Sequence, residues 1–329
     1  MRMMTMDREQ IRHIANARME DRRQQAEALA AKRRDEIETK LPQIAEIRRM
    51  QTITASELAA NIFSGMTPEQ KDANFERIKQ SCRESSAMIA KILTEAGYPD
   101  DYDKVKYRCP KCEDTGYTLY GMCDCMKRLI RQVAAEELNA DANMPNADFG
   151  HFDLEMYRGV TVNKMDAYKV MKKVYEDCVD YAENFTPESE SLLFIGSPGL
   201  GKTHLSLSIA RRVIERGYNV VYGSLLDRLR QIESEHFGKT EGDTLSLLLD
   251  VDLLVLDDLG TEPHTPFYAS TLYNIINTRI NTRKPVIVST NLSTAELTNE
   301  YNERIISRLF YSYRSVMFIG QDIRRLMRR

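Results

Sequence analysis

The chain has 329 residues, of which 42% are hydrophobic and 29% are charged, and its formal net charge is −3. This composition is that of a globular protein with enough apolar material for a core, and the length predicts about two domains. No apolar run approaches the roughly 20 residues that span a bilayer, and the N-terminus lacks the apolar segment of a signal peptide. Six cysteines without an export signal argue against a disulfide scaffold. We therefore expect a cytoplasmic protein that does not associate with membranes.

The first hundred residues predict a helical region. In a highly charged stretch, one helical face carries the apolar residues Ile37, Leu41, Ile44 and Ile47. Pro42 would begin or kink a helix there. This thin stripe fits a partner-binding or self-associating arm and fits a solvated helical tail equally well. A further helix is predicted to begin at residues 67–70, with a threonine N-cap and a first-turn proline, and to end near Gly97.

Four cysteines follow, with the spacing C-x₂-C-x₁₀-C-x-C, at Cys109, Cys112, Cys123 and Cys125. Clustered thiolates of this kind suit a structural zinc site, and the spacer has glycines near both ends, which predicts a short hairpin. The C-x-C half is tighter than the usual C-x₂-C, so Cys82 or His151 could replace one ligand. A redox pair or free thiols are the alternatives to zinc.

The second half of the chain predicts an α/β fold. Residues 141–158 are rich in Asn, Asp, Pro and Gly and predict a linker, and a helix is expected over about 163–184. Beyond it, helical stretches alternate with short apolar runs that predict strands at 192–195, 220–222, 253–256, 286–289 and 316–319. This alternation is typical of a parallel sheet flanked by helices.

A phosphate-binding loop is predicted directly after the first of these strands. Residues 196–203 read Gly-Ser-Pro-Gly-Leu-Gly-Lys-Thr and fill the pattern G-x-x-x-x-G-K-[ST]. Glycines let backbone N–H groups close around phosphate oxygens, Lys202 would reach the β/γ-phosphates, and the Thr203 hydroxyl would hold Mg²⁺. Together with one acidic residue downstream, the expected ATP-binding residues are Gly196, Ser197, Pro198, Gly199, Leu200, Gly201, Lys202, Thr203, His204 and Asp257.

Two further strand ends carry polar side chains suited to the same site. We assign Asp257 to the magnesium side and Asp258 to the attacking water, which it would orient or deprotonate. Asn291 ends the next strand, where its amide could bond a γ-phosphate or that water, although Ser289-Thr290-Asn291 could equally serve as a helix start. Arg304 and Arg308 lie four apart on one helical face and could stabilise charge at a neighbour's nucleotide or be a solvated pair.

Taken together, these motifs resemble the AAA+ ATPases, in the branch that holds bacterial replicative-helicase loaders (DnaC/DnaI-like) and IstB-like transposition helpers. The resemblance covers about residues 153–325 and is carried by GSPGLGKTHL (196–205), YGSLLDRLRQ (222–231), LLVLDDLG (253–260), VIVSTN (286–291) and ERIISRL (303–309). It implies that Asn291 is sensor 1, that Arg308 (less well Arg304) is the arginine finger, and that Arg324 serves as sensor 2. It also implies an AAA+ core without a C-terminal helical lid, because the chain ends ten residues after Ile319.

The resemblance extends to partners and domain organisation. In the family, the region matching residues 224–231 helps to build a helical assembly and a channel for single-stranded DNA, which Arg228 and Lys239 could contact. Some loaders carry an N-terminal zinc domain that binds the replicative helicase hexamer. We therefore expect a helicase-binding region at 1–140 with a zinc module at about 105–128, a linker at 141–160 and an AAA+ ATPase domain at 161–329.

The resulting hypothesis is an ATP-dependent loader that uses ATP, Mg²⁺ and Zn²⁺, self-assembles with ATP, hydrolyses it slowly and delivers a helicase to single-stranded DNA. The alternatives are an IstB-like helper of DNA transposition and an ATP-switch regulator of a DNA-remodelling complex.

Overall fold

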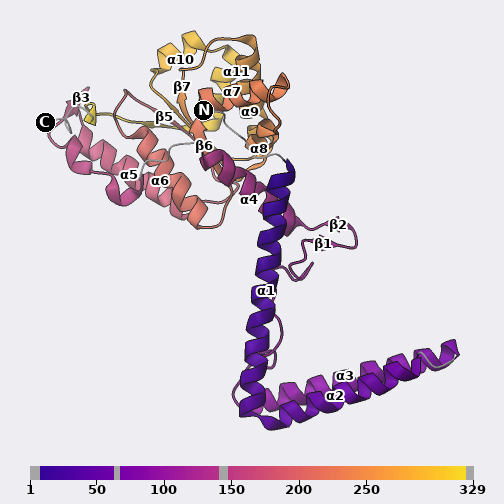
Figure 1. Cartoon of the computed structure of the whole chain (residues 1–329). Coiled ribbons are helices and arrows are strands. Elements are labelled where there is room, and N and C mark those ends of the chain that lie inside the picture. The colour runs from indigo at the N-terminus through magenta and orange to yellow at the C-terminus, as the bar shows by residue number, and fades with distance from the viewer. Residues whose placement is uncertain (1–7, 63–66, 141–146, 324–329) are drawn as a thin grey trace. The chain divides into compact units, whose positions relative to one another are not determined.

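The computed structural model describes residues 8–62, 67–140 and 147–323 (Figure 1). They form two compact units: residues 16–126, and a second unit made of residues 8–15 together with the described residues from 127 onward. Among the described residues, no helix is both long enough and apolar enough to cross a membrane. Arg324, the predicted sensor 2 residue, lies outside the described residues.

The first unit is helical, as predicted. It contains most of α1 (Arg8–Lys40), α2 (Pro42–Ile62) and α3 (Pro68–Glu95), and Pro42 occupies the first position of α2. Ile37 and Ile44 are fully buried, and they pack with Ile89 and Leu93 of α3. The apolar stripe is therefore core within the chain, and neither the binding arm nor the solvated tail is correct for it.

The cysteine region follows α3 in the same unit. The predicted hairpin is present: β1 (Tyr117–Thr118) pairs antiparallel with β2 (Gly121–Met122), with Thr118 opposite Gly121. Its connection is the two-residue turn Leu119–Tyr120. Helix α4 (Asp124–Ala140) begins directly after the hairpin.

The second unit is an α/β domain. Short elements come first: η1 (Phe149–His151), η2 (Leu154–Tyr157), β3 (Thr161–Val162) and β4 (Met165–Asp166). Its main strands are β5 (Ser191–Ile195), β6 (Val220–Ser224), β7 (Leu253–Leu259), β8 (Val286–Thr290) and β9 (Tyr313–Met317). Its helices are α5 (Ala167–Glu183), α6 (Lys202–Glu215), α7 (Leu225–His236), α8 (Thr244–Asp250), α9 (Pro266–Asn281), α10 (Thr294–Glu300) and α11 (Glu303–Ser312).

These five strands form one parallel sheet in the order β6-β7-β8-β5-β9, so the strand before the phosphate loop lies between β8 and β9. Alternate residues of β5 point to opposite faces. Leu192 and Phe194 pack with α5 and α6, whereas Leu193 and Ile195 pack with α7 to α11 (Figure 1). Burial on both faces explains why the strands read as continuous apolar runs, and the predicted α/β fold with a helix-flanked parallel sheet is confirmed.

Several predicted boundaries differ from the structure, since β6 and β7 extend beyond the predicted runs, to Ser224 and Leu259. The last strand is Tyr313–Met317 and not 316–319, since Phe318 is buried beyond the strand end, where its N–H donates to the Ile195 carbonyl (2.8 Å). Helix α5 begins at Ala167, because the Asp166 side chain caps it and residues 161–166 form a small antiparallel pair.

The last turn of α4 covers the outer edge of the sheet. The Asn139 side chain donates to the Val220 carbonyl (2.7 Å) and accepts from the Tyr222 N–H (3.1 Å), so it takes the place of a neighbouring strand along β6. Arg228 of α7 donates to the Leu138 carbonyl (2.8 Å) and is 5% exposed. Its expected role in contacting DNA is therefore wrong, because the side chain is used to hold α4 on the domain. Capping of this kind protects an edge strand from pairing with other chains.

Candidate functional site

The phosphate loop connects β5 to α6, and its backbone requires glycine. Gly199 and Gly201 have φ angles of 75° and 80°. A Cβ on Gly199 would lie 1.8 Å from an Asp322 carboxylate oxygen, and one on Gly201 would lie 2.6 Å from the Phe152 ring. The loop is therefore closely enclosed by residues from both before and after the sheet, as a rigid phosphate cradle needs to be.

The start of α6 is left open for a ligand. Gly201 is its N-cap and has no side chain to bond the first N–H groups, whereas Thr265, Ser293 and Asn302 cap α9, α10 and α11. The N–H groups and the positive end of the helix dipole can then serve an anion.

Lys202 lies inside the loop. The residue is only 5% exposed. Its Nζ donates to the carbonyls of Gly196 (2.6 Å) and Ser197 (2.9 Å) and to Oδ1 of Asn291 (2.8 Å). Three acceptors offset the cost of burying the ammonium group. The lysine and asparagine predicted from separate motifs, 89 residues apart, are thus in direct contact.

The two neighbouring aspartates of β7 contact different residues. Asp257 accepts from the Thr203 hydroxyl (2.7 Å) and from the Ser289 hydroxyl. Asp258 accepts from the Asn291 amide (3.1 Å). The structure therefore brings the predicted magnesium-side pair together and separately joins the predicted water-side pair. Ser289 is a contact that we did not assign from the sequence.

The ladder between β7 and β8 is irregular at these two aspartates. Leu256 pairs with Val288 and Leu259 with Thr290, so the register slips across the two aspartates, and Asp258 has a φ angle of 60°. A regular strand would point neighbouring side chains to opposite faces. An irregularity with a non-glycine residue in the left-handed region is a local cost that occurs preferentially at functional sites.

A cavity of about 400 Å³ opens beside the loop. Its polar lining includes Lys202, Thr203, Asp258 and Asn291. Its apolar lining includes Ala147, Phe152, Met156, Leu200 and Ile323. A cavity of this size with both polar and apolar lining suits a nucleotide.

Residues 147–158, which the sequence suggested as linker, supply part of that cavity. Tyr157 is fully buried and its hydroxyl donates to the Leu200 carbonyl of the loop (3.0 Å). Burial raises the pKa of Tyr157, which keeps this donor protonated. His204 lies against the Phe152 ring and its Nε2 is 2.8 Å from the Asp148 carbonyl, so the structure shows it anchoring this segment.

The predicted finger arginine is not at this cavity. Arg308 lies on α11, where Nε donates to Oδ1 of Asn277 (2.8 Å) and the guanidinium lies 4.7 Å from the centre of the Tyr273 ring. Neither Arg304 nor Arg308 is among the described residues that line the cavity. Arg308 can therefore act at a nucleotide only if that nucleotide is bound elsewhere, such as in a second copy.

The four cysteines meet at one point in the first unit. Their sulfurs lie within 4.8 Å of one another, at 3.8 Å for Cys109–Cys123 and 3.3 Å for Cys112–Cys125. A tetrahedral zinc site with bonds of about 2.3 Å separates its sulfurs by about 3.8 Å. The residues present therefore fit a metal ion. Among the described residues, Cys82 and His151 are outside this group, and His151 instead bonds Asp148 (2.7 Å).

The surrounding backbone fixes the first pair of thiols. The buried Asp114 carboxylate accepts from the N–H groups of Arg108 (2.8 Å) and Cys109 (2.9 Å). Although burial alone raises the pKa of Cys109, hydrogen bonds from the backbone of Cys112 and Lys111 and from the neighbouring thiols together lower the pKa to about 7. Burial and the neighbouring thiols raise the pKa of Cys125. Without a cation, the four sulfurs cannot all be ionised at this spacing.

Comparison with known proteins identifies the second unit. The sequence profile of the family described as IstB-like ATP binding protein matches residues 133–316, which is more than half of the chain. The chain belongs to this family. It is thus an ATP-binding protein of the AAA+ ATPase class, and the predicted resemblance is confirmed.

The chain is also similar to individual proteins. The chain is 29% identical over 131 residues to the replicative helicase loader DnaC of Escherichia coli K12, covering 39% of this chain and 54% of that one. It is 30% identical over 141 residues to DnaC of Buchnera aphidicola (subspecies Baizongia pistaciae), covering 42% and 57%. A solved DnaC helicase loader structure is 24% identical with a TM-score of 0.45, over 53% of this chain and 97% of that one. The chain spans about half the length of these curated relatives.

Proposed function

We propose that this protein is an ATP-dependent loader of a replicative DNA helicase onto single-stranded DNA. Two sets of findings support this. The curated relatives that match are named as replicative helicase loaders, and the cysteine cluster, which precedes the family match, adds a module of the kind expected for binding a helicase. The cysteine cluster is the single observation that carries the choice of loader over transposition helper.

In the proposed mechanism, the ATP triphosphate occupies the phosphate loop. Lys202 exchanges its bonds to the loop carbonyls and Asn291 for phosphate oxygens, because a buried ammonium gains more from an anion than from neutral acceptors. Thr203 and Asp257, already in contact, would hold Mg²⁺, whose role is to neutralise charge on the β- and γ-phosphates. The base would lie against apolar lining residues of the cavity, such as Phe152 and Met156.

Asp258 and Asn291 would act on the water that attacks the γ-phosphate. Their side chains bond one another and both line the cavity, which supports a carboxylate acceptor and an amide acting together near the γ-phosphate. We assign Asp258 to accepting the water proton and Asn291 to orienting the water or the phosphate. Asn291 is released for this role only when Lys202 turns to the nucleotide, so ATP binding itself would prepare the site.

Completion of the site needs a second copy. Arg308, held away from its own cavity, would reach the γ-phosphate bound by a neighbour and stabilise the charge of the transition state. ATP would then favour assembly, since ADP lacks the phosphate that the arginine contacts. Slow hydrolysis would permit release of the loader from the helicase.

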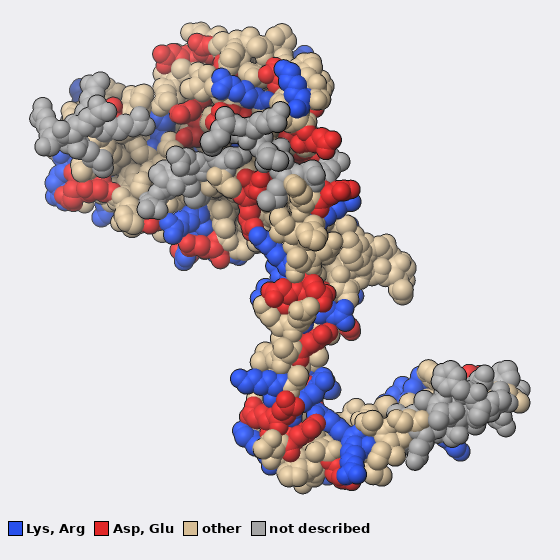
Figure 2. Space-filling model, in the orientation of Figure 1, with Lys and Arg blue, Asp and Glu red and all other residues tan. Residues whose placement is uncertain are grey.

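In the first unit, zinc would hold Cys109, Cys112, Cys123 and Cys125 and support the hairpin. Leu119 and Tyr120 form the hairpin turn and are 100% and 99% exposed. Polar or glycine residues normally occupy such a turn. Residues 115–122 carry no charge, and Figure 2 shows this uncharged projection. Because nucleic-acid binding depends on Lys and Arg, an apolar pocket on the helicase is the better fit for this tip.

The test is capture of the purified hexameric replicative helicase from the same organism by the full chain. A loader should bind the helicase stoichiometrically and transfer it to circular single-stranded DNA only when ATP is present. Absence of any complex with the helicase would overturn the proposal.

The family match supports one alternative, an IstB-like helper of transposition, because the matching profile describes IstB-like ATP binding proteins. A helper would bind and bend duplex DNA in an ATP-dependent manner without binding helicase. Sedimentation with duplex DNA, in parallel with the helicase capture, separates the two functions. An ATP-switch regulator without turnover is less well supported, since Asp257 and Asp258 are both present and both engaged in the site.

A further inference from the structure

Arg308 is held by another helix of its own subunit. Its Nε donates to Asn277 Oδ1 (2.8 Å), one terminal nitrogen donates to the Arg304 carbonyl (3.1 Å), and its plane lies 4.7 Å from the centre of the Tyr273 ring. A half-exposed arginine normally samples many rotamers. Here an edge, a face and one end of the guanidinium each have a partner, which restricts its orientation before any neighbour arrives.

Both holding residues belong to α9 and lie one turn apart. Tyr273 and Asn277 are at positions i and i+4, so they share one face of that helix. The opposite side of α9 is buried in the core through Leu272, Ile275, Ile276 and Arg279. The helix therefore has one face in the core and another against Arg308.

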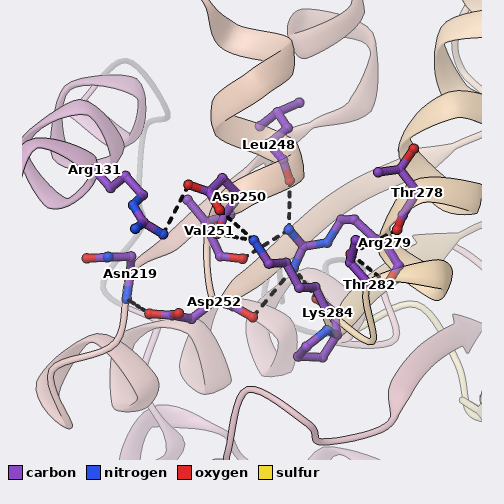
Figure 3. Close-up of polar contacts among 11 residues, drawn as sticks. Arg131, Asn219, Leu248, Asp250, Val251, Asp252, Thr278, Arg279, Thr282 and Lys284 are labelled. Atoms are coloured by element: carbon purple, nitrogen blue, oxygen red, sulfur yellow. Dashed lines mark hydrogen bonds and ion pairs between the residues drawn. The ribbon is translucent and has the colours of Figure 1, made fainter. Parts of the chain in front are cut away.

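Arg279 fixes this helix to the base of the sheet (Figure 3). Its guanidinium is fully buried and donates to the carbonyls of Leu248 (2.7 Å), Val251 (3.0 Å) and Pro285 (2.7 Å). Those carbonyls lie in α8 and just before β7 and β8. Burial lowers the pKa of Arg279 to about 10, so the group remains charged at neutral pH.

A second layer of ion pairs surrounds this anchor. Lys284 bonds both the carbonyl (2.7 Å) and the carboxylate (2.6 Å) of Asp250, and Arg131 of α4 pairs with the same carboxylate at 3.0 Å (Figure 3). The end of α9, the end of α8 and the start of β8 are thereby joined by side chains from three directions. A buried cation of this kind is costly unless its geometry is well satisfied. Carbonyls satisfy the two terminal nitrogens of Arg279 here, whereas its buried Nε has no hydrogen-bond partner among the described residues.

From these contacts we infer that α9 is a fixed platform that pre-positions Arg308, with Tyr273 and Asn277 as positioning residues. The inference rests on the proposed function, in which Arg308 completes a neighbour's ATP site. Pre-positioning means that the arginine loses little rotamer freedom when it meets the phosphate, and its position is set by the same core that carries Asp257 and Asp258. Tyr273 and Asn277 should therefore affect only the site in the neighbouring subunit.

Mixed subunits test this directly. Arg308→Ala subunits keep an intact pocket and lack the arginine, whereas Lys202→Ala subunits lack a working pocket and keep the arginine. If the site is shared, ATP hydrolysis by the mixture exceeds that of either protein alone, and a Lys202→Ala/Arg308→Ala partner gives no such gain. Absence of any gain from the parent mixture would overturn the shared site and this inference with it.

The positioning residues are then changed in one partner at a time. Asn277→Ala or Tyr273→Leu in the arginine-donating subunit should lower the rate of the mixture about tenfold, as misplaced catalytic groups do. The same change in the pocket-donating subunit should leave the rate unchanged. Equal loss from either subunit, or no loss from the arginine donor, would overturn the inference.

Conservative variants guard against a general folding defect. Tyr273→Phe keeps the ring and Asn277→Asp keeps an acceptor for Nε, so both should retain most of the activity of the parent mixture in the arginine donor. If these variants lose as much activity as Tyr273→Leu and Asn277→Ala, the ring and the acceptor are not what positions Arg308.

Discussion

Each of the two units of this protein is stabilised internally in a different way. In the ATP-binding unit, both faces of a five-stranded sheet are buried, and the site consists of polar side chains fixed at the strand ends by that core. In the N-terminal unit, one small core joins the helices around Ile37, Ile44, Ile89 and Leu93, and a separate cysteine cluster organises the hairpin. We infer from this difference that packing positions the nucleotide site, whereas the short hairpin with its exposed apolar turn would depend on a metal ion at the cysteines.

This contrast gives each unit its own point of failure. Metal removal should disable the first unit and leave the second intact, and changes at the phosphate loop should do the reverse.

Zinc removal should have the largest effect. Structural zinc typically contributes about 10 kcal/mol or more at neutral pH, far more than packing around two-residue strands can supply. We expect chelation, or Cys112→Ser, to abolish amide-exchange protection over residues 109–125 while the affinity for ATP stays unchanged. Zinc affinity should also fall as pH falls, because protons compete for the thiolates.

Cys82→Ser is the matched control, because Cys82 lies on α3 and outside the cluster. It should bind one zinc per chain like the wild type. Loss of zinc from this variant would show that the four clustered cysteines are not the complete ligand set.

Arg279 tests the packing side of the comparison. Arg279→Leu removes the donor from three buried carbonyls, each of which costs about 1 kcal/mol or more when unsatisfied, so we expect the free energy of unfolding to fall by about 3 kcal/mol. Urea unfolding of the ATP-binding unit measures this. Arg283→Leu, at an exposed neighbouring position, should change stability little, and equal losses from both variants would contradict the assigned role of the carbonyl cage.

Lys202→Ala tests the ATP site. The ammonium would be the main cation facing the phosphates, so its loss should lower hydrolysis about 100-fold or more, which is typical for removal of one charge-stabilising group. Zinc content and helicase binding should be retained. Lys172→Ala, an exposed lysine on α5, serves as the control and should behave like the wild type.

The hairpin turn should give the smallest of these effects. Leu119→Ser with Tyr120→Ser should weaken helicase binding by about 2 kcal/mol, the size expected for interface anchors, without altering the fold, since both side chains are fully exposed. Isothermal titration with the helicase measures it. Met88→Ser changes another exposed apolar residue of the same unit and should leave the affinity unchanged.

Much of the ATP site could be predicted because its motifs are local. The loop at 196–203, the acidic strand end and Asn291 are each defined by a few consecutive residues, and parallel strands bring their carboxyl ends to one edge. The sequence indicated separate roles for Asp257 and Asp258 but could not show the irregular backbone at this point, because the ladder slip between β7 and β8 is a property of two strands together.

Long-range packing explains the remaining differences. Residues 147–158 have the composition of a linker, yet Tyr157 is buried against the phosphate loop 43 residues later. The sequence predicts that Arg228 could contact DNA, because nothing in its local pattern indicates that α4, some 90 residues earlier, covers it. Asn277 and Tyr273 carry no motif, and only the packing of α9 on α11 brings them to Arg308.

In the proposed function, the N-terminal unit binds the helicase while the ATP-binding unit supplies the nucleotide-dependent step. Size-exclusion chromatography of the full chain with the purified helicase hexamer tests it most directly, using the wild type, the Lys202→Ala variant and the Leu119→Ser/Tyr120→Ser variant. We expect co-elution for the wild type and Lys202→Ala, and a weakened complex for the hairpin variant. A complex lost in Lys202→Ala but kept in the hairpin variant would contradict it.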